Sequence, residues 1–247
     1  MSGQRRKPSP ARRLRPFWLP LTLLGIVAAC AGAFVVAWPG FAPQRVAVTG
    51  NRTVPTSEIA RRARVEAHVN MWLQNTGAMA VRVAAIPYLA NVHVYRVPPA
   101  TVLIAVRERV PFAVVRGEGD AAVVDRDLRV LATATGAETL PAFVLERYVE
   151  LDPGTFLNDA GVKTLRDDYE VMIAAHVVPL ELTFDRFGGL VATMRGGVKI
   201  LFGSDEEFDK KLALVNPVLS QLVRDRKRVE AVDLRAPSTP VLVFRKT

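Results

Sequence analysis

The chain has 247 residues, half of them apolar, and a formal net charge of +9. Residues 1–16 supply six positive charges and no acid, so the remainder carries only +3, which excludes a nucleic-acid-binding surface on charge alone. Cys30 is the only cysteine, which excludes an intramolecular disulfide, so the domains must be held by apolar packing.

The first predicted element is a membrane-spanning helix over residues 17–38, a run that contains no Asp, Glu, Lys, Arg or His. At a helical rise of 1.5 Å per residue it would reach about 33 Å, enough to cross the hydrocarbon core of a bilayer. The basic residues before it predict a cytoplasmic N-terminus and an extracytoplasmic remainder. Phe17 and Trp18 mark one end of the span and Trp38 marks the other, where aromatic rings favour the headgroup zone.

Two other interpretations of this run are a cleaved signal peptide and a lipoprotein signal. Signal peptides have apolar regions of about 7 to 15 residues, shorter than this one, although Ala31-Gly32-Ala33 resembles a cleavage site. Val27-Ala28-Ala29-Cys30 resembles a lipobox, but cleavage there would leave an apolar tail in place of a polar tether. We therefore interpret Cys30 as a small apolar residue of a spanning helix.

An α+β module with the order β-α-α-β-β is predicted next. A strand over residues 44–48 precedes a helix that begins with Thr56 as its cap and buries Ile59, Ala63 and Ala67 at helical spacing. A second helix covers residues 76–86. Two strands, 91–95 and 101–106, follow with a connection too short for a crossover helix.

A second, sheet-rich domain is predicted from residue 112 onward. Short strands are expected at 112–116, 121–125, 129–132, 180–184, 190–194 and 198–202, with glycine pairs at two of the turns. A helix over 158–176 has an apolar face made of Val162, Leu165, Tyr169, Met172 and Ile173.

The last predicted helix begins with a capping box in which the Ser204 hydroxyl and the Glu207 carboxylate bond each other's backbone amides. Pro217 is expected to kink this helix. Its apolar face is Phe208, Leu212, Val215, Leu219 and Leu222, and its basic end is Arg224, Arg226, Lys227 and Arg228. Strands at 232–235 and 241–244 end the chain.

Several phrases resemble the bacterial cell-division family FtsQ/DivIB. Arg96-Val97-Pro98-Pro99 at a hairpin turn and Glu108-Arg109-Val110-Pro111 after the next strand resemble its POTRA domain. The phrases Leu140-Pro141, Gly203 with Lys211-Leu212, and Val232-Asp233-Leu234-Arg235 resemble its C-terminal domain. The resemblance implies a single-pass membrane protein whose extracytoplasmic α+β part is a POTRA domain followed by a sheet-rich domain. The implied divisions are 1–16 (basic cytoplasmic tail), 17–38 (transmembrane helix), 39–43 (linker), 44–111 (POTRA) and 112–247 (FtsQ-type β domain).

The resemblance also implies a function as a non-enzymatic divisome scaffold at the septum of the bacterial inner membrane. Its implied partners are the single-span division proteins FtsB (DivIC) and FtsL, received at the last strands, and other divisome members bound through the POTRA domain. On the residues alone, a final strand with a free edge and one paired on both sides are equally compatible with the pattern, and the resemblance favours the free edge. The implied contact residues are Ser238, Val241, Leu242, Val243 and Phe244, with Ser238 beside Phe244.

No catalytic, metal or cofactor site is predicted. His68, His93 and His176 lack partners at metal-ligand spacing, and no nucleophile elbow or phosphate loop is present. An envelope assembly or secretion chaperone with a POTRA domain is one alternative, although it would require a membrane barrel of about 8 or more strands. A membrane-anchored cell-wall enzyme is another.

Overall fold

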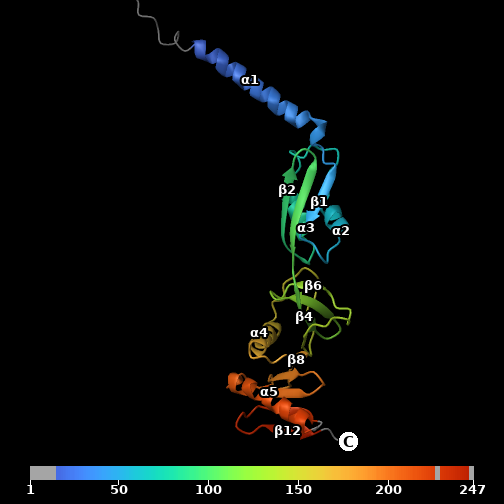
Figure 1. The fold of residues 1–247 in the computed structure, drawn as a ribbon, viewed down its shortest axis with the longest axis vertical. Helices are drawn as coiled ribbons and strands as arrows, with labels where there is room; N and C mark the ends of the chain where they lie inside the picture. Colours follow the sequence, from blue (N-terminus) through green and yellow to red (C-terminus); the bar gives the residue numbers. More distant parts are fainter. Residues whose placement is uncertain (1–14, 226–228, 245–247) are drawn as a thin grey trace, which may run out of the picture. The chain divides into compact units, whose positions relative to one another are not determined.

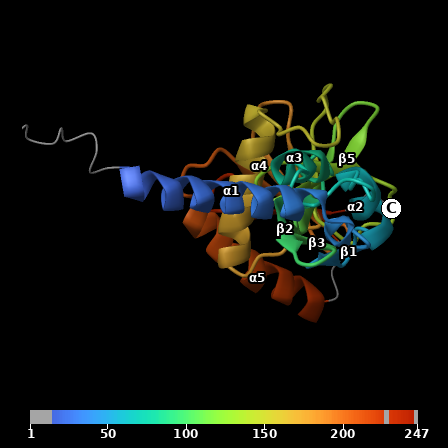
Figure 2. The same cartoon turned by 90° about the horizontal axis from the view of Figure 1, so that it is seen from above.

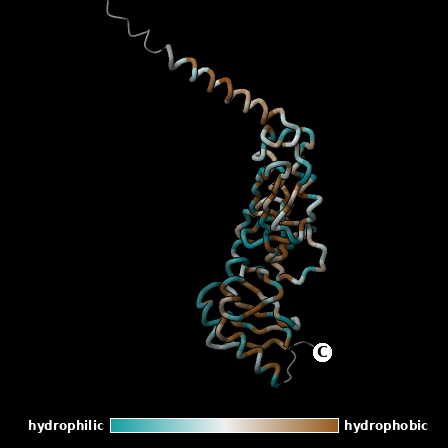
Figure 3. The backbone as a smooth tube through the Cα atoms, turned by 45° about the horizontal axis from the view of Figure 1, so that its top comes forward, coloured by the Kyte–Doolittle hydropathy of each residue, from teal (hydrophilic) through white to brown (hydrophobic). Residues whose placement is uncertain are grey.

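The computed structural model describes residues 15–225 and 229–244, so most of the basic tail, Arg226, Lys227 and Arg228 lie outside the described residues. The first element is helix α1 (Arg15–Ala37), labelled in Figure 1. Its segment Trp18–Ala37 is long and apolar enough to cross a membrane and is not buried in the protein. Figure 3 shows the apolar colour running along it. The helix ends before a 3-10 turn, η2 (Pro39–Phe41), as the Pro39-Gly40 pair predicts.

The described chain divides into two compact units, Met1–Ala84 with Asn91–Arg107, and Ala85–Ala90 with Glu108–Thr247. Beyond α1, the first unit contains a three-stranded sheet in the order β1-β3-β2, with β1 parallel to β3. The predicted order β-α-α-β-β is confirmed. Its elements are β1 (Arg45–Thr49), α2 (Thr56–Ala63), α3 (Thr76–Ala84), β2 (Leu89–Val97) and β3 (Thr101–Glu108).

The buried residues of this unit recur with the period of a strand in β3 and of a helix in α2. Alternate side chains of β3, Val102 and Ile104, are almost fully buried, because they share one face of the strand. Ile59 and Ala63 of α2 lie one helical turn apart and are completely buried.

Helix α2 differs from its prediction at both ends. Thr56 is the first helical residue and not the cap, which is Pro55, and the Thr56 hydroxyl accepts a hydrogen bond from Asn51 Nδ2 at 3.2 Å. The helix stops at Ala63 because Arg64 adopts a left-handed conformation (φ 52°). Ala67, expected on the buried face, therefore lies outside the helix and is exposed.

The second unit is built on a mixed sheet whose described strands have the order β12-β11-β10-β9-β8-β7-β4-β5-β6. Helices α4 (Ala160–Ala174) and α5 (Phe208–Arg224), labelled in Figure 2, cover it. The strands are β4 (Pro111–Arg116), β5 (Ala121–Asp125), β6 (Val130–Thr133), β7 (Ala142–Val144), β8 (Glu181–Phe184), β9 (Leu190–Thr193), β10 (Lys199–Gly203), β11 (Val229–Asp233) and β12 (Val241–Phe244).

One large apolar core joins this sheet to its two helices. Phe143, Leu182 and Phe202 from three strands are completely buried in it. The rings of Phe112, Phe143 and Tyr169 pack edge to face with centroids 5.6–6.3 Å apart. The helices contribute Val162, Leu165, Met172, Leu212, Val215 and Leu222 to the same core.

Strand β7 was not predicted from the sequence. It has only three residues, pairs in parallel with both β4 and β8, and lies between them in the sheet. A buried strand of this length gives no alternation to detect, because period-2 patterning needs at least four residues.

The two helices of the second unit also begin differently from their predictions. Helix α4 is shorter than 158–176: the side chain of Asp159 caps it, accepting from the amide of Val162 at 3.0 Å. The prediction of a capping box for α5 is wrong. Glu207 is itself the N-cap residue, in a left-handed conformation (φ 53°), and no side chain caps the helix. The Glu207 carboxylate instead accepts from Lys210 Nζ at 2.5 Å. Ile173, expected on the buried face of α4, is 38% exposed.

Candidate partner-binding edge

The C-terminal strand β12 lies at one end of the sheet and pairs, among the described residues, with β11 alone. The pairing is antiparallel and joins Val241 to Asp233 and Phe244 to Val229. The strand can be followed at the C-terminal end of the ribbon in Figure 1. A strand with one neighbour presents backbone N–H and C=O groups on its other side, to which another extended segment can add.

The side chains of β12 present unusual apolar area for an edge. Val241, Val243 and Phe244 are 53%, 42% and 54% exposed, respectively. Leu242 is half-buried and packs against the main core. Leu242 and the pairing with β11 therefore hold the strand to the unit, while Val241, Val243 and Phe244 stay exposed. Arg245 and Lys246, which follow this strand, lie outside the described residues.

Two hollows flank the strand. One, of about 180 Å³, lies along the last turns of α5 and is lined by Val218, Gln221, Leu222, Asp225, Pro240 and Leu242. The other is lined by Gly196, Gly197, Lys199, Val229, Glu230, Val243 and Phe244. The sequence reasoning missed Val218, Gln221 and Asp225, because they lie beside the predicted buried face of α5 and carry no motif.

Ser238 lies at the other end of the strand from where it was expected. It belongs to the exposed turn between β11 and β12, three residues before Val241. Phe244 pairs with Val229 at the far end of β11. The expectation that Ser238 lies beside Phe244 is therefore wrong, because Ser238 lies before Val241, at the opposite end of β12.

An ion pair closes the end of β11. Arg235 Nε lies 3.0 Å from both carboxylate oxygens of Asp233, and this bond holds the pKa of Asp233 below its usual range. The Arg235 side chain crosses Gly203: a Cβ on this glycine would lie 2.8 Å from Arg235 Cγ. Gly203 also has a φ of +69°, so a glycine is required here on two grounds.

Lys211 is hydrogen-bonded to the end of strand β10. Its side chain is buried and its ammonium group donates to the carbonyl oxygens of Phe202 at 2.9 Å and Ser204 at 2.8 Å. These two carbonyl groups flank Gly203, where the pairing of β10 with β9 shifts register. Gly203 and Lys211 therefore shape the end of β10. This strand pairs with β11, which in turn pairs with β12.

The expected membrane-anchor ends lie at the two ends of α1. Trp18 is 69% exposed, and Phe17 lies in the first turn. Trp38 follows the last helical residue and is 46% exposed. Cys30 is a free, exposed thiol of the helix.

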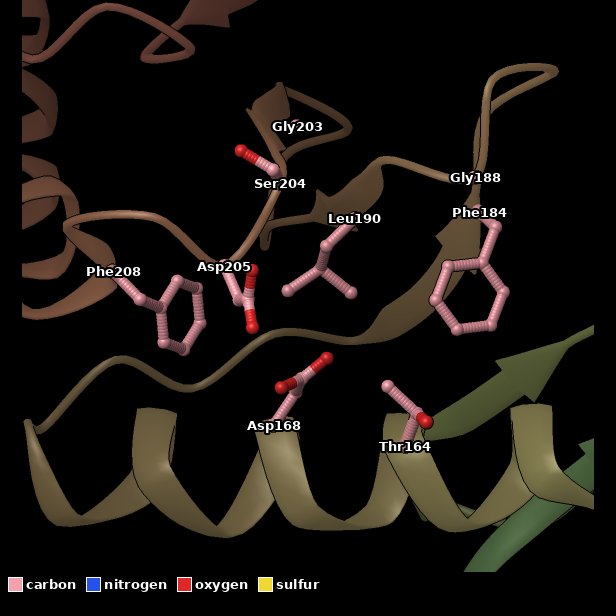
Figure 4. A pocket seen from close by; sticks show the side chains of 9 residues that line it. All are labelled: Thr164, Asp168, Phe184, Gly188, Leu190, Gly203, Ser204, Asp205 and Phe208. Carbon is pink, nitrogen blue, oxygen red and sulfur yellow. The ribbon is translucent and has the colours of Figure 1, made fainter.

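A separate hollow of about 320 Å³ contains two carboxylates (Figure 4). Asp168 of α4 and Asp205 of the loop before α5 point toward each other across it. Burial, and then the charges of Asp167 and Asp205, raise the pKa of Asp168 to about 6. The other lining residues are Thr164, Phe184, Gly188, Leu190, Gly203, Ser204 and Phe208.

The side chains that could bind a metal are spread over the described part of the chain. Within residues 15–225 and 229–244, no three His, Cys, Asp or Glu side chains are grouped as metal ligands. His93 stacks on Tyr95 of the same strand at 6.2 Å between ring centroids. His68 and His176 lie in the segments that follow α2 and α4.

Comparison with known proteins gives two family matches. Residues 41–109 match the POTRA domain of FtsQ type. Residues 113–235 match the C-terminal domain of the cell division protein FtsQ/DivIB, so β12 follows the matched segment.

Curated relatives agree with these matches. The cell division protein FtsQ of Mycolicibacterium smegmatis is 25% identical over 199 residues, which cover 81% of this chain and 58% of the relative. The FtsQ proteins of Mycobacteroides abscessus and Mycobacterium leprae are each 23% identical, over 91% and 98% of this chain and 68% and 69% of their own lengths. The chain thus spans less than two thirds of the length of the Mycolicibacterium smegmatis relative. With its FtsQ-type POTRA domain, its FtsQ/DivIB C-terminal domain and one apolar N-terminal helix, the chain belongs to the FtsQ/DivIB family, whose members are non-enzymatic cell-division proteins.

Proposed function

We propose that this chain is a divisome scaffold that links early and late cell-division proteins by adding a partner strand to β12. The partners are FtsB/DivIC-like and FtsL-like single-span division proteins. The proposed contact residues are Ser238, Val241, Leu242, Val243 and Phe244. The observation that carries the proposal is an edge strand with three apolar side chains between 42% and 54% exposed.

Strand addition suits this edge for two physical reasons. Backbone hydrogen bonds to an edge strand supply affinity irrespective of side chains, while pockets for alternate side chains supply selectivity. The hollows beside Leu242 and beside Val243 and Phe244 are candidates for such pockets. Burial of the exposed part of Phe244 would contribute further through the hydrophobic effect.

We propose a type II topology in the bacterial inner membrane, with enrichment at the division septum. Six positive charges before the apolar run favour a cytoplasmic N-terminus. The proposed divisions are a tail at 1–16, a spanning helix at 17–38, a linker at 39–43, the POTRA domain at 44–111 and the β domain at 112–247. The POTRA domain would bind other divisome members by a second surface, near α3 and β3.

The test is co-purification of the full chain with an FtsB-like partner. Val243→Glu places a charge at the edge and Phe244→Ala removes its largest exposed ring, so each is expected to reduce the recovered partner at least tenfold. Val223→Glu is the matched control, because Val223 is 78% exposed on α5 and outside the edge. Unchanged recovery with both edge variants would contradict the proposal, provided circular dichroism shows that all three variants are folded.

A further inference from the structure

A loop of the first unit is bonded to the end of α1. The side chain of Asn70, which is 9% exposed, donates from Nδ2 to the carbonyl oxygens of Val35 and Val36, each at 2.9 Å. Its Oδ1 accepts from the amide of Trp72, also at 2.9 Å. The last carbonyl groups of a helix have no partner within the helix, so Asn70 supplies one that lipid cannot.

The same loop is pinned from its other side. Gln74, 6% exposed, donates from Nε2 to the carbonyl oxygens of Glu66 and Val69, both at 2.7 Å. Arg96 of β2 donates to the carbonyl oxygens of Met71 at 2.8 Å and Gln74 at 2.6 Å. A segment with this many backbone partners has a defined conformation.

Two large apolar side chains of this ordered loop are nevertheless exposed to solvent. Trp72 is 46% exposed and Leu73 is 61% exposed. Trp38 is also 46% exposed, and the ring of the half-buried Phe41 lies beside that of Trp72, with centroids 6.3 Å apart. Large exposed apolar side chains on an ordered segment form a surface that indicates an interaction site.

The bond from Asn70 sets the depth of this surface. The 20 residues of Trp18–Ala37 extend about 30 Å as a helix, which matches the hydrocarbon thickness of a bilayer. Val35 and Val36 then lie at its outer boundary, and Asn70 lies within hydrogen-bond distance of them. Trp72 is two residues further along the chain, a reach of at most about 7 Å.

We propose that Trp72 and Leu73 form a second membrane contact of this protein, inserting into the outer leaflet of the bilayer that α1 spans. This inference rests on the proposed spanning topology of α1. The headgroup zone is where an indole can bury its ring and keep its N–H hydrated. The occupant of this surface is therefore phospholipid, and the contact holds the POTRA domain at the membrane surface.

The test uses fluorescence of the full chain in phosphatidylcholine vesicles with and without brominated acyl chains, which quench nearby indoles. The chain has three tryptophans, so Trp18→Phe with Trp38→Phe leaves Trp72 as the only one. We expect brominated lipid to quench Trp72 and aqueous iodide to have little effect on it. Equal Trp72 emission in both kinds of vesicle, with full access to iodide, would overturn the inference and leave a protein partner as the occupant.

A second variant reports on α1 separately. Trp18→Phe with Trp72→Phe leaves only Trp38, which brominated lipid should quench if α1 spans the bilayer. Quenching of Trp38 without quenching of Trp72 contradicts the loop contact alone. Loss of quenching at both positions contradicts the spanning topology, and with it the proposed scaffold at the membrane.

A matched pair of asparagine variants tests the role of the bond to α1. Asn70→Ala, in the background with Trp72 alone, removes the donors to Val35 and Val36 and is expected to decrease quenching by brominated lipid. Asn75→Ala is the control, because the Asn75 side chain accepts from the amide of Ala78, at the start of α3, at 2.9 Å and belongs to the cap of that helix. Equal quenching in both variants would show that Asn70 does not position the loop.

Discussion

The buried side chain of Lys211, in the first turn of α5, donates a hydrogen bond to the carbonyl oxygen of Phe202 at 2.9 Å. A second bond, to Ser204 at 2.8 Å, satisfies the carbonyl group on the other side of Gly203. Lysine is almost never fully buried without partners, so these two acceptors explain why a cation sits on the apolar face of a helix. The spacing between Gly203 and Lys211 thus places the lysine ammonium group beside the two carbonyl groups that flank Gly203 at the end of β10.

Lys211→Met should destabilise the second unit by about 2–4 kcal/mol, because two carbonyl groups lose their donor while the apolar volume is kept. Urea unfolding of the full chain in detergent measures this change. Lys210→Met is the matched control: Lys210 is 72% exposed, and its pair with Glu207 is worth at most about 1 kcal/mol. Equal stability of the two variants would contradict the structural role of Lys211.

Asp125→Asn should destabilise the same unit by about 3 kcal/mol, because it leaves a guanidinium without its buried counter-charge. Arg109 and Asp125 form an ion pair with side chains only 13% and 6% exposed, and the other Asp125 oxygen accepts from the amide of Arg129 at 2.8 Å. Asp127 approaches the same arginine at 3.4 Å but is 77% exposed. Asp127→Asn, followed by the same urea unfolding measurement, is therefore expected to change stability by less than about 1 kcal/mol.

The contribution of Asp168 to stability should fall as pH rises from about 4 to above 6, because Asp168 is protonated more readily in the folded chain than in the unfolded chain. Its pKa is about 6 when folded, above the ordinary aspartate value of about 3.9, so the folded state binds the extra proton between these values. The half-buried position screens this effect to about 1 kcal/mol. Asp168→Asn should flatten this part of the profile. Asp167→Asn should flatten it only partly, since Asp167 contributes less than burial does. An unchanged profile in Asp168→Asn would contradict the assignment.

The sequence was most informative where a period or a motif repeats along one element. The order β-α-α-β-β and the apolar faces of α5 and, except for Ile173, of α4 follow from side-chain periodicity and are confirmed. The apolar N-terminal helix follows from composition and is present, while its spanning of a bilayer stays a prediction. The hairpin turns also follow, because Gly188, Gly196 and Gly197 have the positive φ that such turns require.

The sequence was least informative where a tertiary contact overrides a local preference. Ser204 and Glu207 have the pattern of a capping box, yet Ser204 lends its carbonyl oxygen to Lys211 and Glu207 turns left-handed. Leu128 carries the positive φ of its turn (φ 62°) although a glycine would do so at lower cost, because its side chain is 1% exposed in the core. The bond between Asn70 and α1 joins residues 34 and 35 positions apart, so no window of the sequence contains it.

We propose that this chain acts in cell division through the edge strand β12. The most direct measurement is the position of fluorescent fusions of the full chain and of an FtsB-like partner in dividing cells whose own copy is depleted. With the unaltered chain we expect a mid-cell band of both proteins. With Val243→Glu we expect a mid-cell band of the chain but not of the partner. A uniform envelope signal from the unaltered chain, or a partner band that persists with Val243→Glu, would contradict this proposal.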